Sequence, residues 1–200
     1  MKGLLYALLF MMVFSPPAAA GRTAEVETLL KTKIDKVLHI LNDKKLDKAV
    51  KDDLILELVN PVFDFQLIGK LSLGKKNWSR LPAERREEYY DLFTKKLQRS
   101  YLRKLDLYNG EDMIYDSPVE KGKKVHIATY LDLKENKMEI VYKFYESPKG
   151  WLIYDLEIAG VSTVTTEKSQ FDGLLRDGTI DDLMAELRKK GDFSEDEEKK

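Results

Sequence analysis

The sequence predicts an α+β fold, in which an antiparallel, twisted sheet of about four strands packs against a layer of helices. Apolar residues recur at helical spacing through residues 23–106, and they alternate with polar residues through most of residues 125–158. Helical spacing returns in residues 169–191. Strands that follow one another directly are expected to pair as hairpins, which gives an antiparallel meander. Helices before and after such a meander imply one helical layer on the sheet, with room for a cavity between them.

The N-terminal segment has the features of a secretory signal. Lys2 precedes an 11-residue apolar run, residues 4–14, and small residues at 18–20 offer a cleavage site before Gly21. The run is much shorter than the roughly 20 apolar residues that a membrane-spanning helix needs, which disfavours a retained N-terminal anchor. We therefore expect residues 1–20 to be a cleaved signal peptide and the chain to be periplasmic.

Composition narrows the remaining possibilities. The chain has 34 Lys and Arg against 35 Asp and Glu, so it has no basic excess of the kind that nucleic-acid binding requires. It has no cysteine, which excludes disulfides, thiol catalysis and a lipid-modified N-terminal cysteine. We expect a single domain over residues 21–193 and a charged, disordered tail over residues 194–200.

Two helices are predicted before the first proline of the domain. Residues 23–42 place their apolar side chains on one stripe, and residues 47–59 repeat the pattern. Pro61 then suits the first position of a new helix, because the residue before a proline avoids the α region. The segment that follows is short and very apolar, and it ends near Gly74.

The strongest predicted helix begins at Pro82. A proline at the first helical position and Glu84 in the first turn are typical of a helix start. The helix extends to about residue 106, and most residues of its apolar stripe are aromatic. Such a stripe is more often ordinary core than the wall of a ligand site.

The second half of the chain has the period of β-strands. The predicted strands are residues 113–119, 125–131, 138–146 and 151–158, of which the first has the weakest pattern. Two short helices close the domain. The first covers residues 169–176, and the second begins at Thr179, where Asp182 completes a capping box, and ends at Gly191.

Short motifs for catalysis or metal binding do not satisfy their structural requirements. Residues 69–76 resemble a phosphate-binding loop, but they lack the final Ser or Thr and follow a helical pattern. Residues 160–164 resemble a nucleophile elbow without its second glycine. The two histidines, His39 and His126, form no metal-ligand pair. We therefore expect no catalytic residue, no metal and no cofactor, which favours a binding function.

Several stretches, in their order along the chain, resemble one family. They are Val62-Phe63-Asp64-Phe65 with Leu73-Gly74 and Trp78; Pro82 to Arg85 with Phe93 and Tyr101; Tyr142 with Trp151-Leu152-Ile153-Tyr154-Asp155; Glu157-Ile158-Ala159-Gly160-Val161-Ser162; and Ser169-Gln170-Phe171. This order is similar to that of the MlaC, or toluene-tolerance, family of periplasmic phospholipid-binding proteins. The resemblance covers about residues 25 to 190.

The resemblance implies a monomeric carrier that is not an enzyme and that holds acyl tails in an apolar ligand cavity between sheet and helices. Its expected partners are a phospholipid ligand, an inner-membrane ABC transporter complex with an MCE-domain ring, and an outer-membrane lipoprotein complex. From the helices, the candidate lining residues are Phe63, Phe65, Ile68, Leu71, Phe93, Leu97 and Tyr101. From the sheet, they are Ile127, Tyr142, Phe144 and Trp151. Lys75, Lys76 and Arg80 are alternatives for meeting a phosphate at the cavity mouth, although a solvated charge run accounts for them as well.

One departure from the family pattern leaves alternatives open. Where family members commonly have Asn-Tyr-Arg, this chain has Thr166, Glu167 and Lys168. A hopanoid-associated lipid carrier of the same family therefore remains an alternative. The others are a periplasmic adaptor that binds no lipid and has a fully packed core, and an enzyme that uses buried carboxylates.

Overall fold

The computed structural model describes residues 18–133 and 136–192. The predicted tail and most of the predicted signal peptide lie outside these residues. Residues 18–20, the last of the predicted signal peptide, form the first turn of a helix. Among the described residues, no helix is both long enough and apolar enough to cross a membrane.

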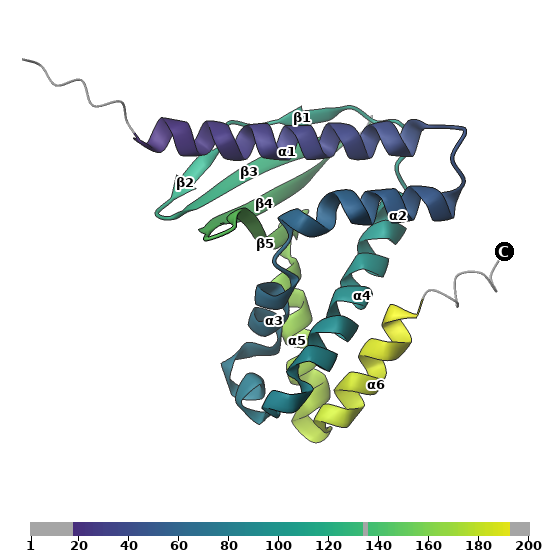
Figure 1. The fold of residues 1–200 in the computed structure, drawn as a ribbon, viewed down its shortest axis with the longest axis vertical. Helices are drawn as coiled ribbons and strands as arrows, with labels where there is room; N and C mark the ends of the chain where they lie inside the picture. The colour runs from purple at the N-terminus through teal and green to yellow at the C-terminus, as the bar shows by residue number, and fades with distance from the viewer. Residues whose placement is uncertain (1–17, 134–135, 193–200) are drawn as a thin grey trace, which may run out of the picture.

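The order of elements is helical, then β, then helical (Figure 1). The first helical part consists of α1 (Ala18–Asn42), α2 (Lys48–Val59), the 3-10 turn η1 (Asn60–Val62), α3 (Phe65–Arg80), the 3-10 turn η2 (Ala83–Arg85) and α4 (Arg86–Leu105). The strands are β1 (Met113–Tyr115), β2 (Val119–Lys121), β3 (Lys124–Asp132), β4 (Lys137–Ser147), β5 (Gly150–Ile158) and β6 (Val161–Ser162). The chain then forms α5 (Thr163–Asp177) and α6 (Ile180–Gly191).

The antiparallel sheet is confirmed, with six strands in the described residues rather than about four. The strands lie in the order β1-β3-β4-β5-β6, and β2 also pairs with β3. The predicted strand over residues 113–119 is in fact two short strands, β1 and β2, which pair with opposite ends of β3. Pro118 lies between them and has no N–H to donate to a ladder. β6 has only two residues and is too short to produce a periodic pattern.

After α2, three helix starts differ from the prediction. Pro61 lies in the 3-10 turn η1, and α3 starts only at Phe65, where Asp64 caps it. Pro82 is the N-cap of η2, so that α4 begins four residues later than predicted. α5 begins at Thr163 rather than residue 169, because Ser162 accepts a hydrogen bond from the backbone of Thr165. The first turn of α5 is mostly polar, so the sequence shows no hydrophobic periodicity there. α6 has the predicted capping box.

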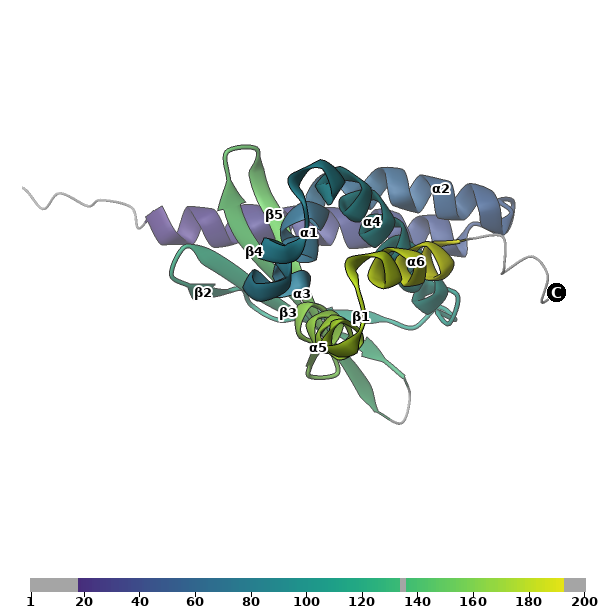
Figure 2. The ribbon, with the colours of Figure 1, turned by 90° about the horizontal axis from the view of Figure 1, so that it is seen from below.

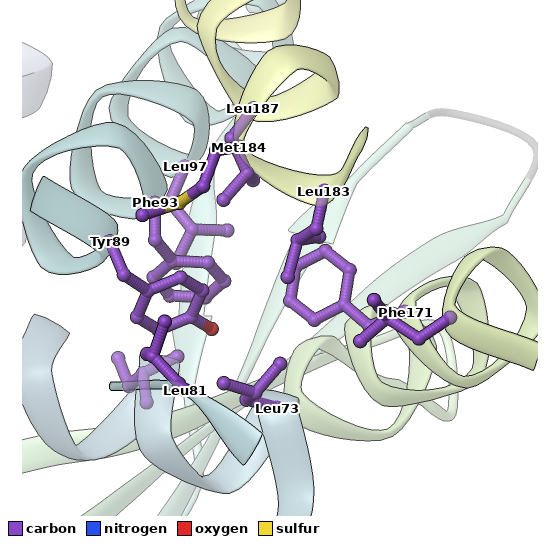
Figure 3. Packing of buried hydrophobic residues seen from close by; sticks show 11 residues of the cluster. Leu73, Leu81, Tyr89, Phe93, Leu97, Phe171, Leu183, Met184 and Leu187 are labelled. Carbon is purple, nitrogen blue, oxygen red and sulfur yellow. The ribbon is translucent and has the colours of Figure 1, made fainter. Parts of the chain in front are cut away.

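The helices form two layers rather than one. α1 lies along the inner face of the sheet, whereas α3, α4, α5 and α6 pack together below it (Figures 1 and 2). α1 buries Val26, Leu30 and Ile34 against the sheet. The lower helices have their own buried cluster (Figure 3). We call these two sets of side chains the sheet cluster and the helical cluster. The two clusters lie in different layers, although the sequence shows a single run of helical periodicity over residues 23–106.

Two glycines illustrate how backbone geometry restricts the sequence. Gly74 interrupts α3 with φ +72° and ψ 158°, a conformation that L-residues avoid. A Cβ at this position would lie 3.1 Å from Cε of Lys168. Gly173, in contrast, lies inside α5, and a Cβ there would meet no neighbouring atom within 4 Å.

We expect Gly74→Ala to lower the free energy of unfolding by roughly 1–3 kcal/mol, because alanine is strained at this backbone conformation. Gly173→Ala is the control, and it should raise that free energy by about 0.5–1 kcal/mol, since it removes a helix-interior glycine. Chemical denaturation of the two variants measures both values. Equal effects of the two substitutions would contradict the assigned break in α3.

Candidate functional site

The eleven predicted lining residues do not surround one space. Four of them belong to or pack against the helical cluster, namely Phe65, Ile68, Phe93 and Leu97. Four others belong to or pack against the sheet cluster, namely Ile127, Tyr142, Phe144 and Trp151. Phe63 and Tyr101 pack against both clusters and form the junction between them. Leu71 joins neither cluster and is 41% exposed on α3.

The helical cluster is tightly packed around Phe93. The Phe93 ring stacks on Tyr89 with 5.8 Å between centroids and meets Phe171 edge-on at 6.0 Å. Figure 3 shows these rings filling the space between α4, α5 and α6. Gly69 allows the approach of α3, because a Cβ there would lie 3.0 Å from the Phe93 ring. These residues are the core of the helical layer.

The junction between the layers is aromatic. The Phe63 ring lies 5.4 Å from the Phe65 ring and 6.0 Å from the Tyr101 ring, measured between centroids. The Tyr101 hydroxyl and the Thr163 hydroxyl are 3.3 Å apart, with Tyr101 as donor. Phe63 also forms an isolated β-bridge with Ile153, so that the residues just before α3 lie beside β5.

Two carboxylates hold the layers together at this junction. The buried Asp155 on β5 accepts hydrogen bonds from the Lys143 ammonium, the Ser162 hydroxyl and the Val164 N–H. The half-buried Asp64 caps α3 and accepts a hydrogen bond from the Tyr145 hydroxyl. Each carboxylate therefore bonds both to the sheet and to the start of a helix. Because bonds to an ionised group are stronger than neutral ones, they fix the position of α3 and α5.

The inner face of the sheet is buried along the whole of β3, whereas along β4 it is covered over only part of its length. Near Val125, Phe144 and Trp151 it is sealed by the first half of α1. Further along β4, the inward side chains are only half-buried, and the apolar stripe of α1 becomes half-buried as well. We call this part the half-covered apolar face, which consists of Leu38, Tyr101, Met113, Ile140 and Tyr142.

The two tyrosines of the half-covered apolar face lie deep in the molecule. Burial raises the pKa of Tyr142 to about 12, while a hydrogen bond with Thr129 acts in the opposite direction. Burial also raises the pKa of Tyr101. Both side chains nevertheless retain accessible surface. Neither side chain is therefore fully sealed by its neighbours.

The rim near β1 is polar. The Tyr115 hydroxyl donates to Asp35 of α1 over 3.2 Å, and Lys31 lies 5.4 Å above the Tyr115 ring. Lys104 similarly lies 5.5 Å from the Tyr101 ring, and its pKa is lowered by burial. Long cationic side chains beside an apolar surface can contact a polar ligand end while their methylene groups remain buried.

Two concave sites lie away from the predicted residues. The first, of about 390 Å³, lies between α5 and α6 with Lys96 at its wall. The second, of about 580 Å³, is an open groove between α1 and α2 that includes His39. None of the eleven predicted residues lines either site. In the described residues, no group of three His, Cys, Asp or Glu side chains could hold a metal ion.

The motif candidates have structural roles. Residues 69–76 lie in α3 and follow the turn η1 rather than a strand, so they are not a phosphate-binding loop. The Ser162 hydroxyl caps α5 and donates to Asp155.

The departure at Glu167 is explained by a buried ion pair that sequence reasoning missed. Glu167 is 6% exposed, and its carboxylate binds the ammonium of Lys96, which is 8% exposed. The pair lies between α4 and α5, and the second carboxylate oxygen has no hydrogen-bond partner. A signal was present, since Lys96 occupies the apolar stripe between Phe93 and Leu97.

Taken together, the fold and site define an α+β protein whose sheet carries a half-covered apolar face beside a packed helical layer. Comparison with known proteins identifies the family of the chain. The family model of the MlaC protein matches residues 31–189, and the chain belongs to this family.

Two relatives illustrate the similarity. The chain is 24% identical to the intermembrane phospholipid transport system binding protein MlaC of Haemophilus influenzae, over 84% of each chain. It also resembles the solved structure of a phospholipid-binding protein from Ralstonia solanacearum in complex with a phospholipid. That match has a TM-score of 0.71 and 24% identity, and it covers 82% of this chain and 95% of the other. This structural likeness supports the fold.

The buried pair gives a prediction for stability. We expect Lys96→Met or Glu167→Leu alone to lower the free energy of unfolding by about 3–5 kcal/mol, because each leaves one uncompensated buried charge. The double variant should lie within about 1 kcal/mol of the parent or above it, since an apolar pair of similar volume replaces both charges. A double-mutant cycle by chemical denaturation measures this coupling. Additive losses would show that the two side chains are not paired.

Proposed function

We propose that the protein is a periplasmic phospholipid carrier, which holds acyl tails against the half-covered apolar face. The observation that carries this proposal is that face itself, with its deep but accessible Tyr101 and Tyr142. The family membership and the phospholipid-binding functions of the two relatives support it. The sealed half of the sheet and the helical cluster provide the rigid frame around the ligand.

Transfer physics explains why such a carrier is needed. One 16-carbon tail exposes about 15 methylene groups, at about 0.8 kcal/mol each, when it crosses water, which amounts to roughly 12 kcal/mol. A phospholipid has two tails, so unaided transfer through an aqueous compartment is very slow. A protein that shields the tails offsets this cost without any catalytic group. The proposed role therefore requires an apolar cavity and no reactive side chain.

The proposed context is transport between two membranes. The carrier would be the soluble component of an ABC-type lipid transport system, after removal of residues 1–20 as a signal peptide. In this scheme it exchanges lipid with an inner-membrane complex that contains an MCE-domain ring and with an outer-membrane lipoprotein complex. The polar rim with Lys31, Asp35 and Lys104 lies where a headgroup would leave the cavity.

The first experiment is mass spectrometry of lipid extracted from protein that was secreted to a bacterial periplasm and purified without detergent. We expect a diacyl phospholipid at close to one molecule per protein. A hopanoid in its place would retain the carrier function and change the ligand. The absence of any lipid, also after incubation with phospholipid vesicles, would contradict the proposal.

A matched pair of variants locates the ligand. Ile140 and Val141 are neighbours on β4 and are both half-buried, but they point to opposite faces of the sheet. We expect Ile140→Trp to reduce bound lipid at least fivefold, because the added ring fills the space beside the half-covered apolar face. Val141→Trp adds a similar volume to the outer face and should leave the amount of bound lipid unchanged. Equal lipid loss in both variants would place the ligand elsewhere.

A further inference from the structure

The exposed face of α3 carries only basic charge. α3 contains no Asp or Glu, and its basic side chains Lys70, Lys75, Lys76 and Arg80 are all exposed. Together with Leu71 we call these side chains the α3 face. The helix lies on the side of the helical layer away from α6 in Figure 1. Lys168 of α5 lies against Gly74, and its ammonium is paired with Asp172.

The charges of the α3 face are not neutralised by the fold. In the part of the chain that the structure describes, Lys70, Lys75 and Lys76 form no ion pair. The acid beside them, Asp172, binds the Lys168 ammonium and the Asn77 amide. Its pKa is lowered chiefly by the hydrogen bond from Lys168, with a smaller effect of Lys76.

Three other helical lysines in this protein are paired with an acid one turn away. Lys31 binds Glu27, Lys48 binds Asp52, and Lys190 binds Glu186. These i,i+4 pairs are the usual way in which a helix balances surface charge. The α3 face lacks such acids, so its positive potential extends into solvent.

An exposed apolar side chain lies within this basic surface. Leu71 is 41% exposed, on the side of α3 away from its buried residues Ile68, Ser72 and Leu73. Next to it, Lys70 lies 5.5 Å from the Trp78 ring, and Arg86 lies 4.7 Å from the same ring. Trp78 thus holds two cations near the surface, where each gains a cation–π contact.

We infer that the α3 face is a docking site for membranes with anionic lipid headgroups. Cationic side chains around an exposed leucine are the combination by which helices bind to the surface of a bilayer. A specific protein interface needs a well-packed centre with aromatic or Arg anchors in pockets, and a single exposed leucine on a convex helix does not provide one. A bilayer requires no such complementary shape, so an anionic membrane fits this surface better than an acidic protein.

This docking site does not depend on the proposed lipid cavity. Leu71 points away from both apolar clusters, and the basic side chains lie on the outer surface of the helical layer. The site would hold the protein at a membrane surface whether or not a lipid occupies its interior. It therefore adds a direct membrane contact to any contact with protein partners.

The test compares two charge reversals that change the net charge equally. Lys75→Glu/Lys76→Glu alters the α3 face, whereas Lys44→Glu/Lys45→Glu alters two exposed lysines in the loop between α1 and α2. Both variants and the parent are prepared in the same form, so that any contribution of residues 4–14 is common to all. Unchanged denaturation midpoints confirm that each variant is folded. Binding is measured by sedimentation with vesicles of phosphatidylcholine, with and without phosphatidylglycerol.

We expect the parent to bind the phosphatidylglycerol vesicles at low salt, to dissociate at high salt, and to ignore pure phosphatidylcholine. The α3 variant should bind roughly 30-fold more weakly, and the loop variant should change by less than about threefold. Leu71→Ser should weaken binding about fivefold without changing the salt dependence. Equal weakening by the two charge reversals would overturn the inference, as would binding to an acidic protein without any binding to anionic vesicles. Loss of co-purified lipid without loss of vesicle binding would contradict only the carrier function.

Discussion

The structure depends on two carboxylates that join the sheet to the helical layer. Asp155 receives hydrogen bonds from β4 and from the start of α5, and Asp64 starts α3 while it binds Tyr145 on the outer face of β4. Apolar packing alone would not fix this arrangement, because packing has little directional preference. The charged hydrogen bonds set where the two helices leave the sheet. The junction of Phe63 and Tyr101 follows from that geometry.

A second constraint is that α1 covers only part of the apolar face of the sheet. α1 seals this face around Val125 and Trp151, but it does not seal the part around Ile140 and Tyr142. An ordinary core would fill such a space, since voids forfeit dispersion contacts and apolar burial. Along β4 this face keeps apolar surface that its neighbours do not fully cover.

Much of this fold could be predicted from the sequence, because periodicity reports which side of an element is apolar. The alternation in β3, β4 and β5 and the stripe of α4 identified the sheet and its main helix. Periodicity does not report which partner an apolar side meets, so Phe93 and Ile127 were assigned to one space although they belong to different clusters. Leu71 joins neither cluster, because Ile68, Ser72 and Leu73 take the buried side of α3. The pairing of Lys96 with Glu167 joins positions 71 residues apart, which a single sequence does not reveal.

The division into two apolar clusters has a consequence for cooperativity. The clusters share only Phe63 and Tyr101 among the described hydrophobic residues that pack against them, so few contacts couple the packing of one to that of the other. Proteins with such an arrangement open in units, each with its own local free energy. The sheet with α1 forms one unit and the four lower helices form another. Local opening of the sheet with α1 is therefore expected to leave the helical cluster packed.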